Sequence, residues 1–124
     1  MANPNIVSVN SIFGNTTGIA LTTTLTTVLL ANASSTGKVY KIESIMIANV
    51  DGSSAADATI DWNTNAGGTG TSIALAATIA VPADATLSLI DKTNSFYLME
   101  NQSIIGGASA NSDLECIIAY EEIS

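Results

Sequence analysis

Few residues of this chain could act as acids, bases, nucleophiles or metal ligands. Its 124 residues include eleven Asp and Glu, one cysteine and no histidine. Ser-His-Asp and Cys-His catalysis both use a histidine base, and zinc sites are built from several cysteine and histidine side chains. A pair of acids can do glycosidase chemistry, but no spacing singles out two of the eleven. We therefore predict that the chain is not an enzyme, and we expect no cofactor and no bound metal.

One loop carries oxygen atoms of the kind that calcium prefers. In the stretch DGSSAAD, Asp51, Ser53 and Asp57 could each supply a ligand oxygen. The spacing does not follow the EF-hand pattern, and Asp51-Gly52 is also a common hairpin turn. We favour the turn over a calcium site.

The remaining side chains of chemical interest fit structural roles better than binding roles. Trp62 shares a strand face with Ile60, which favours a core position over an exposed sugar-binding platform. Phe96 and Tyr97 point to opposite faces of their strand, so one of the two rings is expected at the surface. Cys116 lies in an alternating apolar segment, and we predict a buried structural thiol.

The charge balance excludes two classes of partner. The chain has three lysines, no arginine and a formal net charge of −8. Nucleic-acid phosphates and anionic lipid surfaces are both bound by Lys and Arg, so we expect no nucleic-acid partner and no membrane partner. Charged residues make up only 11% of the chain, so its surface must consist mostly of hydroxyl, amide and methyl groups.

The apolar pattern predicts an all-β fold. Short segments with alternating apolar residues are separated by turn sequences, and no helical period exceeds two turns. We expect about eight strands in an antiparallel β-sandwich, similar to a jelly roll. The threonine-rich segment 19–30 is predicted as a strand, and residues 28–30 indicate either a bulge or burial on both faces. Residues 71–81 are compatible with strand or helix, and their branched residues favour a strand.

Residues 38–51 form the longest predicted strand. Tyr40 and Ile42 alternate with polar residues, but farther along Ile45 and Ile47 place apolar side chains on the opposite face as well. A strand that is apolar on both faces must be covered twice, either within the domain or by another subunit. Ile45 and Ile47 are therefore candidates for packing in the domain or for contact with a partner.

The first 18 residues are predicted to form an extended N-terminal arm, followed by the sandwich domain over residues 19–124. The arm carries five apolar side chains that are costly to leave in water. An arm of this kind docks onto its own sheet or onto a neighbouring subunit, and an ordinary first strand is the alternative. The candidate contact residues of the arm are Ile6, Val7, Val9, Ile12 and Phe13.

Two stretches resemble small virion structural proteins of tailed bacteriophages, especially those of marine hosts. They are VYKIESIMIANVDGSSAA, which begins at Val39, and FYLMENQSIIGGASANSDLECIIAYEEIS, which begins at Phe96 and contains the final YEEI. The resemblance covers roughly residues 38–60 and 86–124, about half of the chain. It consists of strand and turn residues and includes no catalytic motif.

The resemblance implies a head decoration, or cement, protein on the capsid exterior, made in the host cytoplasm. Its partners would be the major capsid protein or other virion proteins, and it would act as a homo-oligomer. Threefold symmetry is expected from the class of protein and not from any residue. In this role the arm would face the capsid, and Ile45 and Ile47 would pack in the domain or between subunits.

Two other functions remain open at this stage. One is a tail, neck or fibre protein of the virion that contacts the host surface, with Trp62 or Tyr97 binding a glycan. The other is a cellular β-sandwich module for adhesion, which would be expected to carry a secretory signal that the first residues do not resemble.

Overall fold

The computed structural model describes residues 4–124, which form nine β-strands and no helix. Alternating apolar side chains and frequent turn residues give short strands, as expected for an all-β domain. The strands are β1 (Ile12–Ala20), β2 (Val28–Asn32), β3 (Val39–Asn49), β4 (Ala56–Asn63), β5 (Ser72–Val81), β6 (Thr86–Ile90), β7 (Phe96–Leu98), β8 (Gln102–Ala108) and β9 (Leu114–Ile123).

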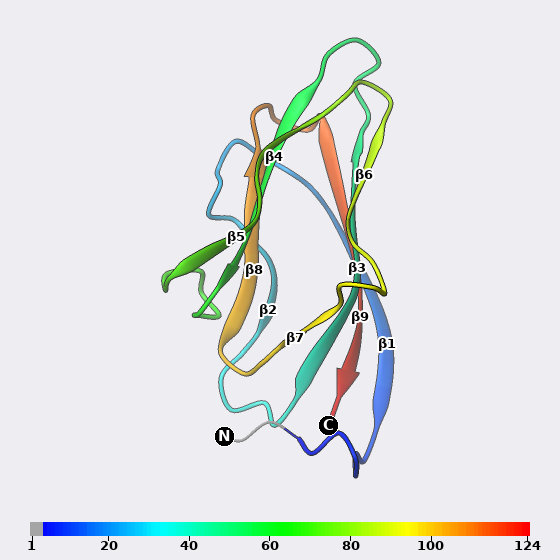
Figure 1. Cartoon of the computed structure of the whole chain (residues 1–124). Helices are drawn as coiled ribbons and strands as arrows, with labels where there is room; N and C mark the ends of the chain where they lie inside the picture. Colours follow the sequence, from blue (N-terminus) through cyan, green and yellow to red (C-terminus); the bar gives the residue numbers. More distant parts are fainter. Residues whose placement is uncertain (1–3) are drawn as a thin grey trace.

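The strands form two antiparallel sheets that pack together (Figure 1). The first sheet has the order β1-β9-β3-β6, and β7 also pairs with β3 beside β6. The second sheet has the order β2-β8-β4-β5. The predicted all-β antiparallel sandwich is confirmed, and residues 72–81 form a strand as the branched residues suggested.

The core lies between the two sheets. Residues at alternating positions of β3, β9, β4 and β8 point inward and are almost fully buried. Cys116 is one of them, as predicted from its alternating segment, and burial raises the pKa of its thiol to about 12. The largest fully buried aliphatic side chains are Leu21, Ile42, Ile45, Ile47, Ile60, Leu98, Ile104, Ile105, Leu114 and Ile118.

Three buried asparagines fix the loops that follow their strands. Asn63 ends β4, and its amide nitrogen donates to Ser72 Oγ (2.9 Å) while its oxygen accepts from the backbone N–H of Gly70 (3.0 Å). Asn49 ends β3 and donates to the carbonyl oxygens of Ser54 and Val81, both at 2.9 Å. Asn32 ends β2 in the same way. A buried amide must have such partners, and groups in the loops and at the ends of neighbouring strands supply them.

The predicted strand over residues 19–30 is divided in the structure. β1 ends at Ala20 and β2 begins at Val28, and the segment between them carries the chain from one sheet to the other. Leu21 is buried at the start of this crossing, whereas Leu25 is exposed. Of the two possibilities at residues 28–30, a bulge is the one observed, because the register of β2 against β8 shifts between Val28 and Leu30.

The separate N-terminal arm is not confirmed. β1 begins at Ile12, so the expected boundary after residue 18 falls inside a strand. Gly14 and Gly18 do not interrupt β1, because both pair with β9 in continuous register. Residues 4–11 precede the strand and contact the end of the sandwich, where Ser11 and Ser124 exchange backbone hydrogen bonds. The first residues of the expected arm, 1–3, lie outside the described part of the chain.

Candidate interaction surfaces

The described residues offer no constellation for metal binding. Within residues 4–124, no three His, Cys, Asp or Glu side chains lie close enough together to hold a metal ion. In the DGSSAAD loop, Asp51 Oδ1 accepts hydrogen bonds from the backbone N–H (2.9 Å) and the hydroxyl (2.8 Å) of Ser53. These bonds hold the pKa of Asp51 below its usual value. The loop thus contains an Asx-type turn. It is not the hairpin turn that we favoured, because β3 and β4 belong to different sheets.

Residues 4–124 include no helix that is long and apolar enough to cross a lipid bilayer.

Ile45 and Ile47 lie in the core. Both side chains are 0% exposed, and the opposite sheet covers them. Of the two possibilities left open by the sequence, packing in the domain is the one observed, so neither residue forms a surface for a partner. The register of β3 against β9 shifts between Ile42 and Ser44. This bulge brings Ile45 and Ile47 to the same face as Ile42, where strict alternation would have placed them on the other face.

The apolar residues of the N-terminal segment are mostly exposed. Val7 is 92% exposed, Ile6 54%, Phe13 63% and Ile12 52%, whereas Val9 is half-buried. Ile12 and Phe13 begin β1 and point to its two faces. Four of the five predicted contact residues are therefore available at the surface of this chain.

A shallow apolar pocket of about 250 Å³ lies beside these residues. It is lined by Pro4, Ile6, Val39, Tyr97 and Met99. Tyr97 and Met99 are two residues apart at the end of β7, so their side chains share one side of the segment and both are partly exposed. The strand alternation predicted an exposed ring at residues 96–97, but the local sequence gave no sign that Val39 would lie beside it.

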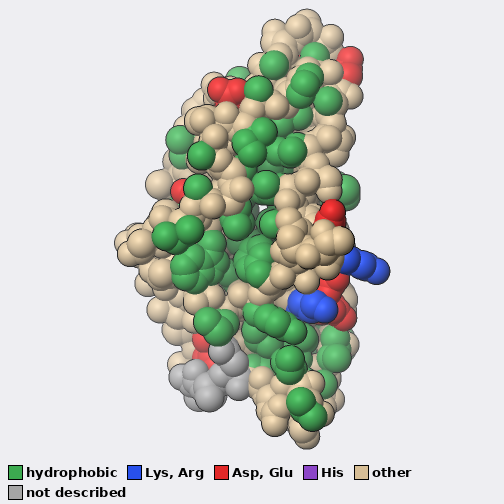
Figure 2. All heavy atoms as spheres, in the orientation of Figure 1, with side chains coloured by type: hydrophobic (Ala, Val, Ile, Leu, Met, Phe, Trp, Pro, Cys, Tyr) green, Lys and Arg blue, Asp and Glu red, His purple; other side chains and the backbone are tan. Residues whose placement is uncertain are grey.

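We define the terminal apolar patch as the exposed apolar side chains at this end of the molecule. Val39 connects the pocket to β1, because Val39 pairs with Ile123 and Ile123 pairs with Ile12 on the same sheet face. Figure 2 shows hydrophobic side chains along the whole visible face, including its lower part. The patch comprises Ile6, Val7, Ile12, Tyr97 and Met99, whereas Phe13 is exposed on the opposite face of β1, in register with Glu122.

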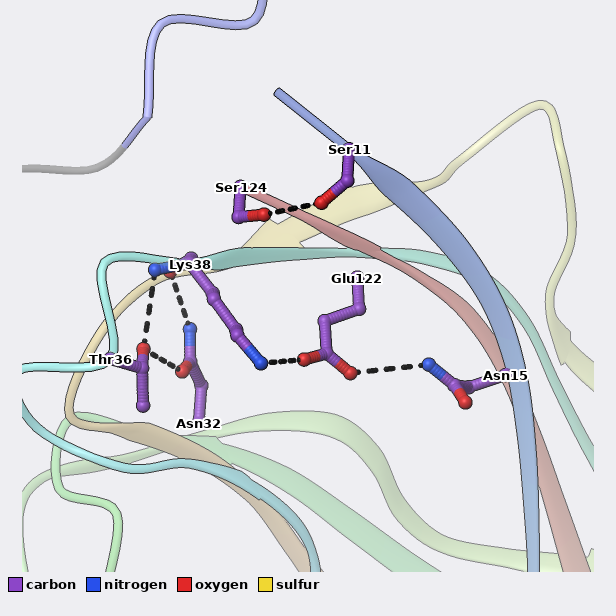
Figure 3. Close-up of polar contacts among 7 residues, drawn as sticks. All are labelled: Ser11, Asn15, Asn32, Thr36, Lys38, Glu122 and Ser124. Carbon is purple, nitrogen blue, oxygen red and sulfur yellow. Dashed lines mark hydrogen bonds and ion pairs between the residues drawn. The ribbon is translucent and has the colours of Figure 1, made fainter. Parts of the chain in front are cut away.

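A polar cluster ties the first and last strands together near this end (Figure 3). Glu122 forms an ion pair with Lys38 and accepts a hydrogen bond from the Asn15 amide (3.2 Å). The hydrogen bond to Glu122 holds the pKa of Lys38 above its usual value. The hydroxyls of Ser11 and Ser124 lie 2.7 Å apart. No histidine is available to activate either serine, so the cluster fits a clamp between strands.

The two aromatic residues considered for glycan binding have different environments. Trp62 is half-buried against the core, and its indole N–H donates to Gln102 Oε1 (3.3 Å). Tyr97 is exposed beside the apolar pocket. Sugar platforms use several exposed rings, and of these two rings only Tyr97 is exposed.

Three charged side chains lie close together on the outer face of the first sheet. Lys41 pairs with Glu121 in the β3–β9 ladder, and Lys41 Nζ lies 3.4 Å from Glu43 Oε1. The pKa of Glu121 is raised, first because its carboxyl shares a hydrogen bond with Glu43, and then by partial desolvation and the charge of Glu43. Lys41 and Lys92 oppose this effect.

We expect Glu121→Gln to raise the melting temperature slightly at pH 7. The pKa of Glu121 is higher in the folded state than in the unfolded state. The Glu121 carboxyl therefore stabilises the fold at low pH, and this stabilisation is lost as the pH rises through the folded-state pKa. After solvent screening, the gain at pH 7 is roughly 0.5 kcal/mol or less. Thermal unfolding at pH 7 and pH 4 measures it, and the difference from the natural chain should disappear at pH 4.

Glu115→Gln is the matched control, because Glu115 lies on the same strand and face but pairs with Ala20 and Ala48. An equal difference between Glu121→Gln and the natural chain at both pH values would contradict the proposed repulsion between Glu43 and Glu121.

No protein-family model and no curated protein sequence matches this chain.

Proposed function

We propose that this chain is a non-enzymatic structural protein of a tailed-phage virion, a head decoration protein that binds and stabilises the capsid lattice as an oligomer. The resemblance of residues 38–60 and 86–124 to such proteins supports the proposal. The surface agrees with it, because the described residues include exposed apolar side chains that could contact a partner.

The observation that carries the proposal is the terminal apolar patch. Isolated apolar side chains are normal on protein surfaces, but a contiguous patch beside a pocket marks a contact site. This patch includes Ile6, Val7 and Ile12, three of the residues expected to face the capsid. The net charge of −8 argues against binding to the packaged nucleic acid and so supports a protein partner.

Co-sedimentation with purified heads tests the proposal. The chain is mixed with empty heads and, separately, with purified tails of the phage that encodes it. We expect saturable binding to heads, and we expect the double variant Ile6→Ser, Val7→Ser to lose at least about tenfold in affinity, because two anchors of the patch are removed. Ile73→Ser is the control, since Ile73 is as exposed (55%) as Ile6 but lies on β5, in the other sheet.

The two virion alternatives give different results in this experiment. Binding to tails and not to heads would favour the tail, neck or fibre function, and glycan binding that depends on Tyr97 would strengthen it. Binding to neither particle would overturn the virion proposal. Equal binding by the double variant and the natural chain would show that the terminal apolar patch is not the contact surface.

A further inference from the structure

β1 presents an unpaired edge along its whole length. It is the outermost strand of its sheet (Figure 1), and among residues 4–124 only β9 pairs with it, without a register shift. The backbones of Ser11 and Ser124 exchange hydrogen bonds of 3.1 and 3.0 Å, and Leu21 N donates to Leu114 O (2.8 Å). Antiparallel ladders alternate, so the odd-numbered residues of β1 bond to β9. The even-numbered residues therefore point their N–H and C=O groups away from the sheet.

This edge lacks the features that keep other sheet edges from pairing. Edges are commonly blocked by charge, proline, bulges or short length. β5 contains register shifts and Thr78 at a φ of 49°. β2 and β6 have five residues each and a register shift, and β7 has three residues. β1 has nine residues, IFGNTTGIA, with no charge, proline or shift, so it can accept another strand.

The sequence of β1 is nearly symmetric about Thr16. If two copies of β1 pair antiparallel across a two-fold axis at Thr16, apolar residues meet apolar residues, glycine meets glycine, and polar residues meet polar residues. The backbone pattern agrees, because Thr16 is even-numbered and its N–H and C=O face the free edge. The opposed residues are Ile12 with Ala20, Phe13 with Ile19, Gly14 with Gly18, Asn15 with Thr17, and Thr16 with its own copy.

Other registers match less well. Only the even-numbered residues expose their backbone groups, so the pairing can slip only in steps that pair even with even. A shift of the second copy by two residues in one direction places Phe13 opposite Thr17. A shift in the other direction places Phe13 opposite Leu21, whose side chain is already buried in the core. The register centred on Thr16 alone matches every pair by type.

The charges on the neighbouring strand β9 do not oppose this arrangement. Residues that oppose one another across neighbouring strands form a row that runs across the dimer contact. On the outer face, the row of Glu121 and Gly14 continues into Gly18 and Ile117 of the second copy. The row that contains Glu115 and Ala20 continues into apolar residues in the same way. No carboxylate of β9 therefore lies in the same row as a carboxylate of the other copy, although the chain as a whole is strongly acidic.

We propose that two copies of this chain associate through β1, forming one continuous sheet across a two-fold axis at Thr16. The contact is isologous, since the same strand is used by both copies. It provides backbone hydrogen bonds along the whole edge, and the side-chain pairs fix the register. A two-fold dimer differs from the threefold ring expected from the class of protein, and it does not depend on capsid binding.

Sedimentation equilibrium of the full chain over a range of concentrations tests this proposal. We expect a species of twice the 12.6 kDa chain mass. Thr16→Lys should weaken the dimer by about tenfold or more, because two lysines would face each other at the axis. Thr86→Lys is the control, since Thr86 is an exposed threonine on the outer strand β6, and it should leave the dimer unchanged. A monomer at the highest concentration reached, a trimer, or a dimer unaffected by Thr16→Lys would overturn the proposal.

A chemical cross-link tests the register directly. Thr16→Cys places two exposed thiols across the axis, whereas Cys116 is buried and is not expected to react. Dibromobimane, which becomes fluorescent only after it bridges two thiols, should label the Thr16→Cys chain as a covalent dimer and should not bridge Thr86→Cys. Circular dichroism confirms that each variant is folded. A folded Thr16→Cys chain that forms no bridge would overturn the register. Neither measurement uses phage heads, so failure of this proposal is distinguishable from failure of the proposed function.

Discussion

Gly106→Ala is expected to lower the free energy of unfolding by about 3 kcal/mol. Gly106 lies in β8, paired with Ile60 of β4. A Cβ added at Gly106 would lie 2.4 Å from the Thr59 carbonyl oxygen and 2.8 Å from Ile60 Cδ1. The oxygen belongs to the backbone of a paired strand, so it cannot move away without disturbing the sheet. The backbone N–H of Gly106 also donates to Thr27 O (2.9 Å), which holds β8 in place from the other side.

Urea denaturation followed by circular dichroism measures this change. Gly52→Ala is the matched control, because its added Cβ would lie no closer than 3.7 Å to the Asp84 carboxylate in an exposed turn. We expect the control to change stability by no more than about 0.5 kcal/mol. A loss below about 1 kcal/mol for Gly106→Ala would show that β4 and β8 can separate to admit a methyl group, contrary to the structure.

The all-β class could be predicted from the sequence because it depends on local patterns. Apolar alternation and turn dipeptides are properties of neighbouring residues, and they identify most strands and loops of this chain. The segment 21–27 shows the limit of such patterns. Its threonines favour a strand, yet Thr23 N bonds to the Asn111 side chain (2.9 Å), and the Thr22 and Thr24 carbonyls lie against Gly107. These partners are more than 80 residues away in the chain, and no local pattern encodes them.

The same limit explains why some candidate contact residues are exposed and others are buried. Ile6 and Phe13 are exposed in the structure, so they remain candidate contact residues. For Ile45 the apolar pattern left packing in the domain and contact with a partner both open, because a bulge between Ile42 and Ser44 changes which face the strand presents. A bulge is set by the partner strand β9 and not by the residues of β3 alone. Only the paired sheet determines which face of β3 is buried.

Ile47→Ala tests this interpretation and is expected to cost about 2–5 kcal/mol of folding free energy. Ile47 is 0% exposed and pairs with Cys116 and Leu87, which are also packed in the core. Truncation removes buried methyl groups and leaves a cavity, because the surrounding strands can close only partly. A loss of this size is a large part of the total stability of a small domain, which is about 5–15 kcal/mol. Urea denaturation of the purified variant measures it.

Met46→Ala is the control, because Met46 is the next residue of the same strand and points to the opposite, outer face, where it is 40% exposed. We expect it to cost less than about 1 kcal/mol. If Ile47 were instead a contact for a partner, Ile47→Ala would leave the stability of the isolated chain intact and weaken its association. Comparing Ile47→Ala with Met46→Ala therefore distinguishes core packing of Ile47 from contact with a partner. Equal stability losses at both positions would show that the bulge does not set the buried face of β3 as described.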